Sequence, residues 1–487
     1  MPNYQEIQKL SEQTTLPHRH ICNEHNITPN AIQAVCRGIA GDESVEVRSS
    51  LIHGTKSPYH GSEPIDEDTT IAVGSVTKMF TSASLLKLWD QELTAKKSGG
   101  LADGQTENFP DGIDTGLSHF MAGLKAKFPD CSYLETIEAA PHYSQVTLRD
   151  LLNHTHALGG SRDDAQIAKV LMDNPDKQFS CAETVQFLKI NPDDKFGEFK
   201  YGSLGTELSG MIMELVTGET YGQVLQDAVL DPVGATRSRL KSVSETDANS
   251  TLGYCYITPM ELGEGESKKE YSGEINFNTS GNGVAAGGLK TTPEDADKFI
   301  RKFLSQEAGE SSLFENAEVV AALFRDEGKA GKHNICGVNN YRDGTFGHNG
   351  DNGLSESSLK YNPTTRESFY YAAVGETLTF AVAYEMLSKQ KEPGTKIAKE
   401  EVFLKQEELL KAGFGFEEMK SMVDQGVSFG KIAENLNVVI EEKAVKSDSL
   451  VERLGLQKPE EKPRSFVEAV QARKHGEMNS PGGAHEL

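Results

Sequence analysis

The sequence predicts an α+β fold: an antiparallel sheet flanked by helices, with an all-helical lobe inserted into it and a helical extension at the C-terminal end. Two observations predict this class. Short apolar runs with strand character occur before residue 75 and return after residue 345, and the long segment between them has mostly helical periodicity. The simplest folding of that order is one sheet made from both ends of the segment, with the helical block between them.

The composition describes a globular chain with a strong negative charge. Its 487 residues carry a formal net charge of −24, and 37% of them are hydrophobic. An acidic chain repels the phosphates of nucleic acid and of anionic lipid, so we expect neither as a partner. No apolar run approaches the roughly 20 residues of a membrane-spanning helix. The first residues lack the apolar core of a secretory signal, so we expect a cytoplasmic protein, or one exported without a cleaved signal peptide.

The sheet is expected to come from two separate stretches of one main domain, residues 36–386. Residues 1–35 have the polar, helical pattern of a lead-in. The sheet lobe is assigned to residues 36–75 and 275–386, because β-branched and aromatic runs alternate there with Gly, Asp and Ser. The expected strands are 45–47, 50–52, 70–73, 346–348, 354–361 and 368–374.

The helical lobe is assigned to residues 76–274, where apolar residues recur at helical spacing. Within it, residues 94–145 contain Gly99-Gly100 and a Pro-Asp-Gly turn and have a loop-rich composition. This stretch is interpreted either as a lid over the site or as surface decoration. The expected helices are 77–92, 117–128, 147–152, 165–172, 182–188 and 206–217.

The C-terminal part changes character. Residues 387–457 are highly charged and helical in pattern, and Pro393-Gly394 is expected to act as a linker. We expect this helical module to dock a protein partner or a second copy of the chain. Residues 458–487 are rich in Pro, Gly and charge, a composition typical of disorder.

A serine and a lysine, Ser75 and Lys78, lie three apart where an apolar run gives way through Gly74 to a long helical pattern. Residues at this spacing share one helix face. A lysine there can take the proton of the serine, or stabilise the group that does, and so make the hydroxyl a nucleophile. The same spacing recurs at 84–87, 238–241 and 428–431, so the pattern alone is weak.

Two further elements carry chemistry. Tyr201 follows a lysine and opens an amphipathic helix; a phenol beside a cation can shuttle a proton, although a tyrosine at a helix start is often only structural. The second element is a strand that ends in His348, Asn349, Gly350 and Asp351. Backbone N–H groups at such an edge can receive an oxyanion, and a plain turn is the alternative interpretation.

Together these elements resemble the serine β-lactamase-like family, which includes class C β-lactamases, DD-peptidases, penicillin-binding proteins and related esterases. Ser-x-x-Lys is the nucleophile motif of these proteins. Four more stretches match family segments in the same order: Leu-Leu-Asn-His-Thr at 151–155, the helix at 201–218, Leu-Asp-Pro-Val-Gly-Ala-Thr at 230–236 and Ala-Gly-Gly-Leu-Lys-Thr-Thr at 286–292. The resemblance covers about residues 36–386 and implies the β-lactamase/transpeptidase-like fold, with the site in a cleft between the two lobes.

The resemblance also implies roles. Ser75 would be the acylated nucleophile and Lys78 its proton acceptor or the stabiliser of one. Tyr201 would deprotonate the serine or activate the deacylating water, and the sequence does not decide between it and Lys78 as the base. His348 would stand where the family has the lysine of Lys-Thr-Gly. The N–H groups of Ser75 and Asp351 would form the oxyanion hole.

Substrate-binding roles are expected for three neighbours of these residues, Gly350, Asn349 and Ser203. The third motif lacks the Lys, Thr and Ser that hold a substrate carboxylate in lactamases, and an inward-facing Asp351 would repel one. Ser203 stands where the family has Asn and reaches less far toward a substrate amide. We therefore expect poor penicillin hydrolysis and better turnover of a neutral ester, or of an amide with a free amine.

The sequence thus predicts a serine hydrolase that forms an acyl-enzyme on a small ester, amide or peptide, with no metal and no organic cofactor. The alternative is a scaffold of the same fold with weak or no activity, whose acidic C-terminal helices bind a protein partner, since fold alone does not guarantee chemistry.

Overall fold

The computed structural model describes most of the chain between residues 31 and 374. The described stretches are 31–39, 44–56, 63–100, 107–159, 177–189, 194–240, 254–262, 269–276, 284–325, 334–351 (without 342) and 355–374, with isolated positions between them and up to residue 409. The predicted lead-in before residue 31, the helix predicted at 165–172 and the tail at 458–487 lie outside these residues, wholly or for the most part.

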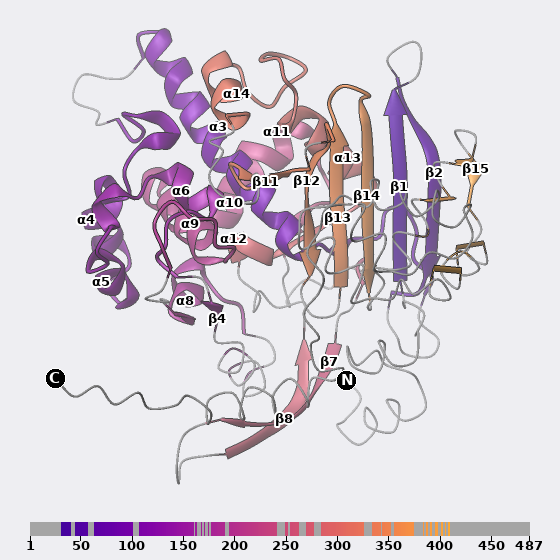
Figure 1. The fold of residues 1–487 in the computed structure, drawn as a ribbon, viewed down its shortest axis with the longest axis horizontal. Coiled ribbons are helices and arrows are strands. Elements are labelled where there is room, and N and C mark those ends of the chain that lie inside the picture. The colour runs from indigo at the N-terminus through magenta and orange to yellow at the C-terminus, as the bar shows by residue number, and fades with distance from the viewer. Residues whose placement is uncertain are drawn as a thin grey trace, which may run out of the picture.

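The largest element is an eight-stranded sheet. In Figure 1 its long strands run vertically and lie side by side. Its order is β10-β11-β12-β13-β14-β1-β2-β15, and its pairs are antiparallel except for β15 with β2. The strands are β1 (Ala31–Ile39), β2 (Val45–Gly54), β10 (Asn334–Ile335), β11 (Val338–Asn340), β12 (Phe346–Asp351), β13 (Ser355–Asn362), β14 (Glu367–Val374) and β15 (Thr395–Lys396).

Both ends of the domain meet in this sheet, as predicted. β1 pairs directly with β14, with Val35 opposite Tyr370 in the register. The prediction was wrong at the boundary: β1 begins at Ala31, so residues 31–35 form a strand rather than the end of a helical lead-in. Their side chains are buried, which explains why a short apolar run there reads equally well as helix or strand.

Other strands differ from the prediction in detail. The two runs expected at 45–47 and 50–52 form the single strand β2. The run at 70–73 contains β3 (Ile71–Ala72), which belongs to a separate three-stranded sheet with β9 (Leu289–Thr291) and β6 (Arg239–Leu240). This small sheet carries the chain from the large sheet into the helices.

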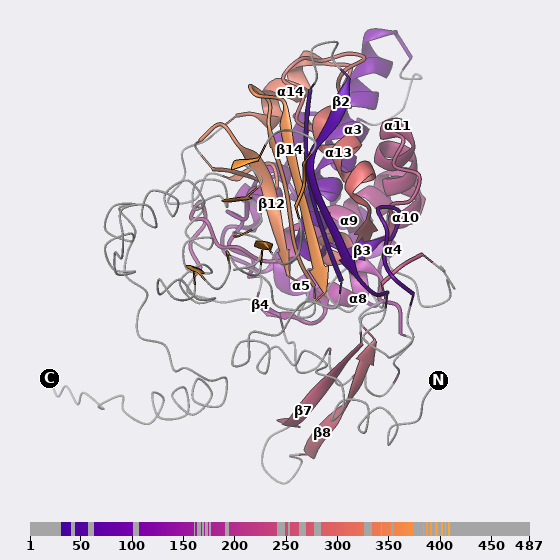
Figure 2. The same ribbon diagram turned by 90° about the vertical axis from the view of Figure 1, so that its right-hand side faces the viewer.

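Helices cover one face of the large sheet (Figure 2). They are α3 (Thr77–Lys97), α4 (Ser118–Lys127), α5 (Tyr133–Glu138), α6 (Leu148–Asn153), α8 (Cys181–Val185), α9 (Leu204–Thr217), α10 (Tyr221–Leu225), α11 (Asp231–Val233), α12 (Val284–Gly287), α13 (Pro293–Phe303) and α14 (Ala317–Leu323), with short turns η1 (Gly74–Val76), η2 (Gly112–Asp114), η3 (Tyr143–Gln145) and η4 (Gln226–Leu230).

The inserted lobe is mostly but not entirely helical, which corrects the prediction of an all-helical lobe at 76–274. It contains β6, the short pair β4 (Ser161–Arg162) and β5 (Leu188–Lys189), and the hairpin of β7 (Tyr254–Leu262) and β8 (Lys269–Asn276). The hairpin projects away from the rest of the molecule in both ribbon views. Its strand β8 also crosses the predicted lobe boundary at residue 275.

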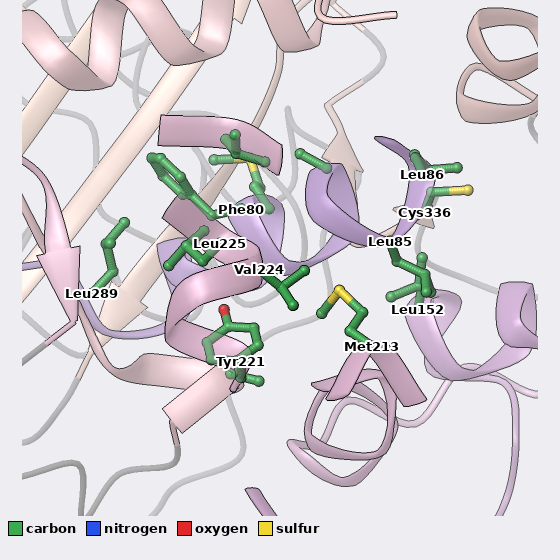
Figure 3. Close-up of a cluster of buried hydrophobic side chains, with 14 of the residues drawn as sticks. Phe80, Leu85, Leu86, Leu152, Met213, Tyr221, Val224, Leu225, Leu289 and Cys336 are labelled. Carbon is green, nitrogen blue, oxygen red and sulfur yellow. The ribbon is translucent and has the colours of Figure 1, made fainter. Parts of the chain in front are cut away.

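Helix α3 lies in the middle of the core and is buried along most of its length. Figure 3 shows its side chains, Phe80 and Leu85 among them, meeting residues of α6, α9 and α10. The ring of Phe80 also stacks on Phe299 of α13, with 3.6 Å between centroids. Burial of large apolar side chains contributes about 1.5–3 kcal/mol each, so the helix that begins just after Ser75 is held from several directions.

The loop-rich stretch at 94–145 is part of the helical lobe. It contributes α4 and α5, and Phe109, Leu117, Phe120 and Leu134 are buried in the core. Helix α4 contacts α9. This stretch therefore contributes buried side chains to the core of the lobe, and its role as a lid stays a prediction.

The helical module predicted at 387–457 lies largely outside the described residues. Its first part belongs to the sheet domain instead, because β15 pairs with Ser49 and Ser50 of β2. Ile397 is buried as well. Within the described part of the chain, no helix is at once long and apolar enough to cross a membrane.

Candidate active site

Ser75 lies in η1, on the turn that leads into α3. Gly74 allows this turn, since its φ of +48° is a conformation that favours glycine. The hydroxyl of Thr77 donates to the carbonyl of Gly74 at 2.6 Å and accepts from the N–H of Leu289 at 3.1 Å. These bonds fix the turn, while Ser75 itself stays partly exposed.

Lys78 contacts Ser75, as the spacing predicted. Its ammonium donates to Oγ of Ser75 at 3.1 Å and to the carbonyl of Ala286 at 3.0 Å. The side chain is only 2% exposed. This contact places the amine nitrogen of a buried lysine against a partly exposed hydroxyl, where its neutral form could take the proton of the nucleophile.

The other Ser-x-x-Lys copies do not form such a pair where the structure describes them. Oγ of Ser84 donates to the carbonyl of Phe80 at 2.9 Å, and the ammonium of Lys87 donates to Asp90 at 2.8 Å. Ser238 bonds to Asp295. The lysine of that copy and the whole copy at 428–431 lie outside the described residues.

Tyr201 stands beside Lys78, three residues before α9. Its position follows from the backbone, because the N–H of Lys200 donates to the carbonyl of His154 at 2.7 Å. The ammonium of Lys78 lies 5.2 Å from the centroid of the Tyr201 ring. Tyr201 is 45% exposed, and its hydroxyl makes no hydrogen bond to the described residues. The structure thus brings the phenol to the Ser75–Lys78 pair without a bond between them.

His348 of β12 completes this group on the sheet side. Its ring lies 5.9 Å from the ring of Tyr201, centroid to centroid. The side chain is 4% exposed, and its Nδ1 is hydrogen-bonded to the carbonyl of Asn349. The four residues predicted to act on the substrate therefore lie together, although they come from α3 and the turn before it, the segment before α9, and β12.

The backbone beside Ser75 is packed against the end of β12. A Cβ on Gly350 would lie 2.0 Å from the carbonyl oxygen of Val73 and 3.0 Å from the nitrogen of Ser75. A Cβ on Gly74 would lie 3.0 Å from the nitrogen of Asp351. The two backbone groups predicted to receive the oxyanion thus lie next to each other, and glycine at both positions makes the approach sterically feasible. Their role in catalysis stays a prediction.

The side chains of Asn349 and Asp351 do not lie where the prediction expected them. Asn349 accepts a hydrogen bond from the hydroxyl of Ser358 at 2.9 Å, on the neighbouring strand. Strand alternation puts this pair on the face opposite Gly350, and it puts the side chain of Asp351 on the Asn349 face. The structure therefore does not bring Asn349 to Ser75, and it does not support repulsion of a carboxylate by an inward-facing Asp351. Ser203 is half-buried at the start of α9 and makes no capping bond.

Sequence reasoning missed the contribution of His154, which the Leu-Leu-Asn-His-Thr stretch had contained. It ends α6 with a φ of +59°, and its ring lies 4.8 Å from that of Tyr201. Neither ring nitrogen finds a hydrogen-bond partner among the described residues. Burial first, and then the positive charge of Lys78, hold the pKa of His154 well below its usual value. The neutral ring of His154 thus packs against the ring of Tyr201.

The side chains that could bind a metal ion are not gathered in one place. Within the described residues, no group of three or more His, Cys, Asp or Glu side chains is arranged to hold a metal ion. The prediction that the site works without a metal or cofactor is not tested by this observation.

Comparisons with known proteins address the family and the fold of the chain. Lovastatin esterase from Penicillium rubens is 26% identical over 271 residues, which cover 53% of this chain and 59% of the esterase. The match thus spans less than two thirds of that enzyme. The octameric penicillin-binding protein homologue from Pyrococcus abyssi has the same fold at 20% identity, with a TM-score of 0.53 over 84% of this chain and 82% of that one.

A D-amino acid amidase from Ochrobactrum anthropi SV3 also matches, at 17% identity, with a TM-score of 0.47 over 73% of this chain and 90% of that one. The Beta-lactamase family model matches residues 41–396, well over half of the sequence. This match confirms the resemblance inferred from the motifs. The chain belongs to the beta-lactamase family, whose β-lactamase/transpeptidase-like α+β fold it shares.

Proposed function

We propose that this protein is a serine hydrolase that cleaves a small neutral ester through an acyl-enzyme on Ser75. The observation that supports it most is the 3.1 Å hydrogen bond between the buried ammonium of Lys78 and Oγ of Ser75. Membership of the beta-lactamase family supports the reaction class, and the similarity to lovastatin esterase supports an ester as substrate.

In the acylation step, Oγ of Ser75 attacks the carbonyl carbon of the ester and gives its proton to the neutral amine form of Lys78 or to the phenolate form of Tyr201. The tetrahedral oxyanion accepts hydrogen bonds from the N–H groups of Ser75 and Asp351. Each such donor typically contributes a factor of about 10²–10³ in rate. The C–O bond to the leaving group then breaks, and the alcohol departs with the proton. The acyl group remains on Ser75.

In the deacylation step, a water molecule attacks the acyl carbon and its proton passes to Lys78 or Tyr201. The bond to Oγ breaks, the carboxylic acid leaves and Ser75 regains its proton. Lys78 contacts Oγ directly, whereas the exposed phenol of Tyr201 is open to water. This division favours Lys78 in acylation and Tyr201 in deacylation, and the variant Tyr201→Phe separates the two roles.

The preference for a neutral substrate follows from β12. A buried His348, with Nδ1 bonded to a backbone carbonyl, stands where the family's lysine would offer a cation to a substrate carboxylate. Without that cation a penicillin carboxylate gains little on binding. We therefore propose faster hydrolysis of short-chain esters than of penicillins, and amides with a free amine as the second substrate class.

The decisive experiment is labelling with a fluorophosphonate, followed by intact-mass spectrometry after incubation with esters, amino-acid amides and penicillin. Labelling must disappear in Ser75→Ala. Ser84→Ala is the matched control, because it removes the other serine of a Ser-x-x-Lys motif on α3, where Oγ bonds only to the helix backbone. The mass added to Ser75 identifies the acyl group.

Absence of labelling in the unaltered protein would contradict the proposed function and favour the scaffold alternative, in which residues 387–457 bind a protein partner. A penicillin turned over as fast as a short-chain ester would leave the hydrolase standing and overturn only the substrate preference.

A further inference from the structure

A buried carboxylate lies behind the Ser75–Lys78 pair, on a residue that the proposed reaction does not use. Glu207 of α9 is 0% exposed. Its Oε1 accepts the N–H of Ala286 at 2.9 Å, and its Oε2 accepts the N–H of Ala285 at 3.3 Å. One carboxylate therefore holds two successive peptide groups of α12.

The peptide chain of α12 connects this carboxylate to Lys78. Ala286 donates its N–H to Glu207, and its carbonyl accepts from the ammonium of Lys78 at 3.0 Å. The orientation that Glu207 gives to Ala286 thus determines where the carbonyl meets the ammonium. Any rotation of α12 would move Lys78 relative to Ser75.

The charges of the two side chains are complementary. A buried ammonium is costly unless an opposite charge or hydrogen bonds compensate it. The described groups that interact with Glu207 are Lys78 from α3 and Cys181 from α8. Burial, and in addition the charge of Glu207, raises the pKa of Tyr221 from α10. Of these, Lys78 is the cation.

We propose that Glu207 is a positioning residue for Lys78: it orients the carbonyl of Ala286 toward Nζ, which keeps Lys78 in contact with Ser75, and it compensates the positive charge that Lys78 gains when it takes the proton of Ser75. This proposal rests on the proposed function, because it assigns Glu207 a role in the same acylation step. Within the described part of the chain, no hydrogen bond joins Glu207 to Ser75.

The proposal predicts that the contribution of Glu207 to the labelling rate of Ser75 depends on pH. Burial raises the pKa of Glu207 to about 7, against the opposing effects of the Ala286 and Ala285 N–H groups and of Lys78. Below that pH the carboxyl is neutral and loses both its charge and part of its acceptor capacity. A glutamine at this position would mimic the neutral acid at every pH.

Glu214 offers a matched control on the same helix. Its carboxylate also accepts a backbone N–H, that of Tyr221 at 2.9 Å, and burial also raises its pKa. It therefore shares the capping function of Glu207 but holds α10 rather than the α12 backbone that meets Lys78. Glu214→Gln removes a comparable bond at a different place.

The test is the fluorophosphonate labelling rate of Ser75 per reactive site, measured for the unaltered protein, Glu207→Gln and Glu214→Gln between pH 6 and pH 8. At pH 8 we expect Glu207→Gln to label about 10- to 100-fold more slowly than Glu214→Gln, the range expected for lost bonds to a charged group. Because a group with a pKa near 7 is about one-tenth ionised at pH 6, this ratio should fall about tenfold there.

Equal rates for the two glutamine variants, or a ratio that does not change with pH, would overturn the proposal while leaving the hydrolase intact. No labelling of the unaltered protein would overturn the proposed function and this inference with it. If Glu207→Gln fails to fold, Glu207→Asp replaces it. Aspartate keeps the charge but ends one methylene short of Ala286, so labelling slower than in Glu214→Gln supports the proposal and an equal rate contradicts it.

Discussion

Gly74 and Asp351 are in direct backbone contact, although they lie far apart in the sequence. A Cβ on Gly74 would lie 3.0 Å from both the backbone nitrogen and the carbonyl carbon of Asp351. This contact joins the turn that carries Ser75 to the end of β12. It is the place where the helical lobe and the sheet together build the predicted oxyanion site.

Gly74→Ala is therefore expected to slow fluorophosphonate labelling of Ser75 by about 10- to 100-fold, because a displacement of about 1 Å at a reacting group costs up to about 10²-fold. Gly99→Ala is the control. Gly99 also has a positive φ, +74°, but nothing lies within 4 Å of its added Cβ. Both variants should lose about 1–2 kcal/mol of stability from the strained φ in urea unfolding. Equal labelling in the two would mean that the contact with Asp351 is not needed.

Tyr201→Phe tests the role of the phenol. The ring contacts with Lys78 and His154 remain, and the lost hydroxyl has no hydrogen bond to the described residues, so stability should change by less than about 0.5 kcal/mol. Turnover of an ester should fall by about 10²–10⁴, as for loss of an acid–base group.

Mass spectrometry of this variant identifies the step. Accumulation of acyl-Ser75 would place Tyr201 in deacylation and leave Lys78 as the base of acylation. Slow acylation with no accumulation would reverse the assignment. Unchanged turnover would exclude the phenol from both steps.

The sequence predicted a local contact of this candidate site and missed a distant one. The contact of Lys78 with Ser75 could be predicted because helical spacing alone brings such side chains together. Glu207 could not be found in this way, since its link to Lys78 passes through Ala286, 79 positions further along the chain. The spacing of apolar and polar residues along a sequence cannot reveal a contact between such distant segments.

Asn349 shows an error that strand geometry explains. The strand was predicted at 346–348, so no alternation of faces was assigned to the residues after it, and Asn349 was given a substrate-binding role. β12 instead continues to Asp351, and alternation along it sends Asn349 to the opposite face. Likewise β15 has only two residues, too few for a period, and was assigned to a linker and a separate module.

Asp90→Ala is expected to lower the free energy of unfolding by about 3–5 kcal/mol, measured by urea denaturation, because it leaves a buried ammonium without its counter-charge. Asp90 is fully buried, accepts from Lys87 at 2.8 Å and holds the N–H of Asn316 at 2.9 Å. The exposed pair of Lys97 and Glu318 is the control, and Glu318→Ala, which leaves the bond of Lys97 to Asn316 in place, should change stability little. A small effect of Asp90→Ala would mean that water or a neighbour replaces the carboxylate.

His156 is expected to make the fold sensitive to acid. The side chain is buried, and its Nδ1 accepts the N–H of Leu158 at 3.0 Å, so protonation would break that bond. Burial lowers the pKa of His156 to about 4 from 6.5, outweighing the opposing charge of Asp150. Because the folded pKa is depressed, the unfolded chain binds more protons between pH 6.5 and 4, and stability is lost as the pH falls through this range.

The loss through His156 amounts to about 3 kcal/mol, from about 1.4 kcal/mol per pH unit. His156→Asn keeps an acceptor for the N–H of Leu158 but does not titrate, so its unfolding free energy should fall less steeply as the pH is lowered through the same range. Parallel pH profiles of the two proteins in urea unfolding would contradict this assignment, because they would mean that the acid sensitivity of the fold comes from other groups.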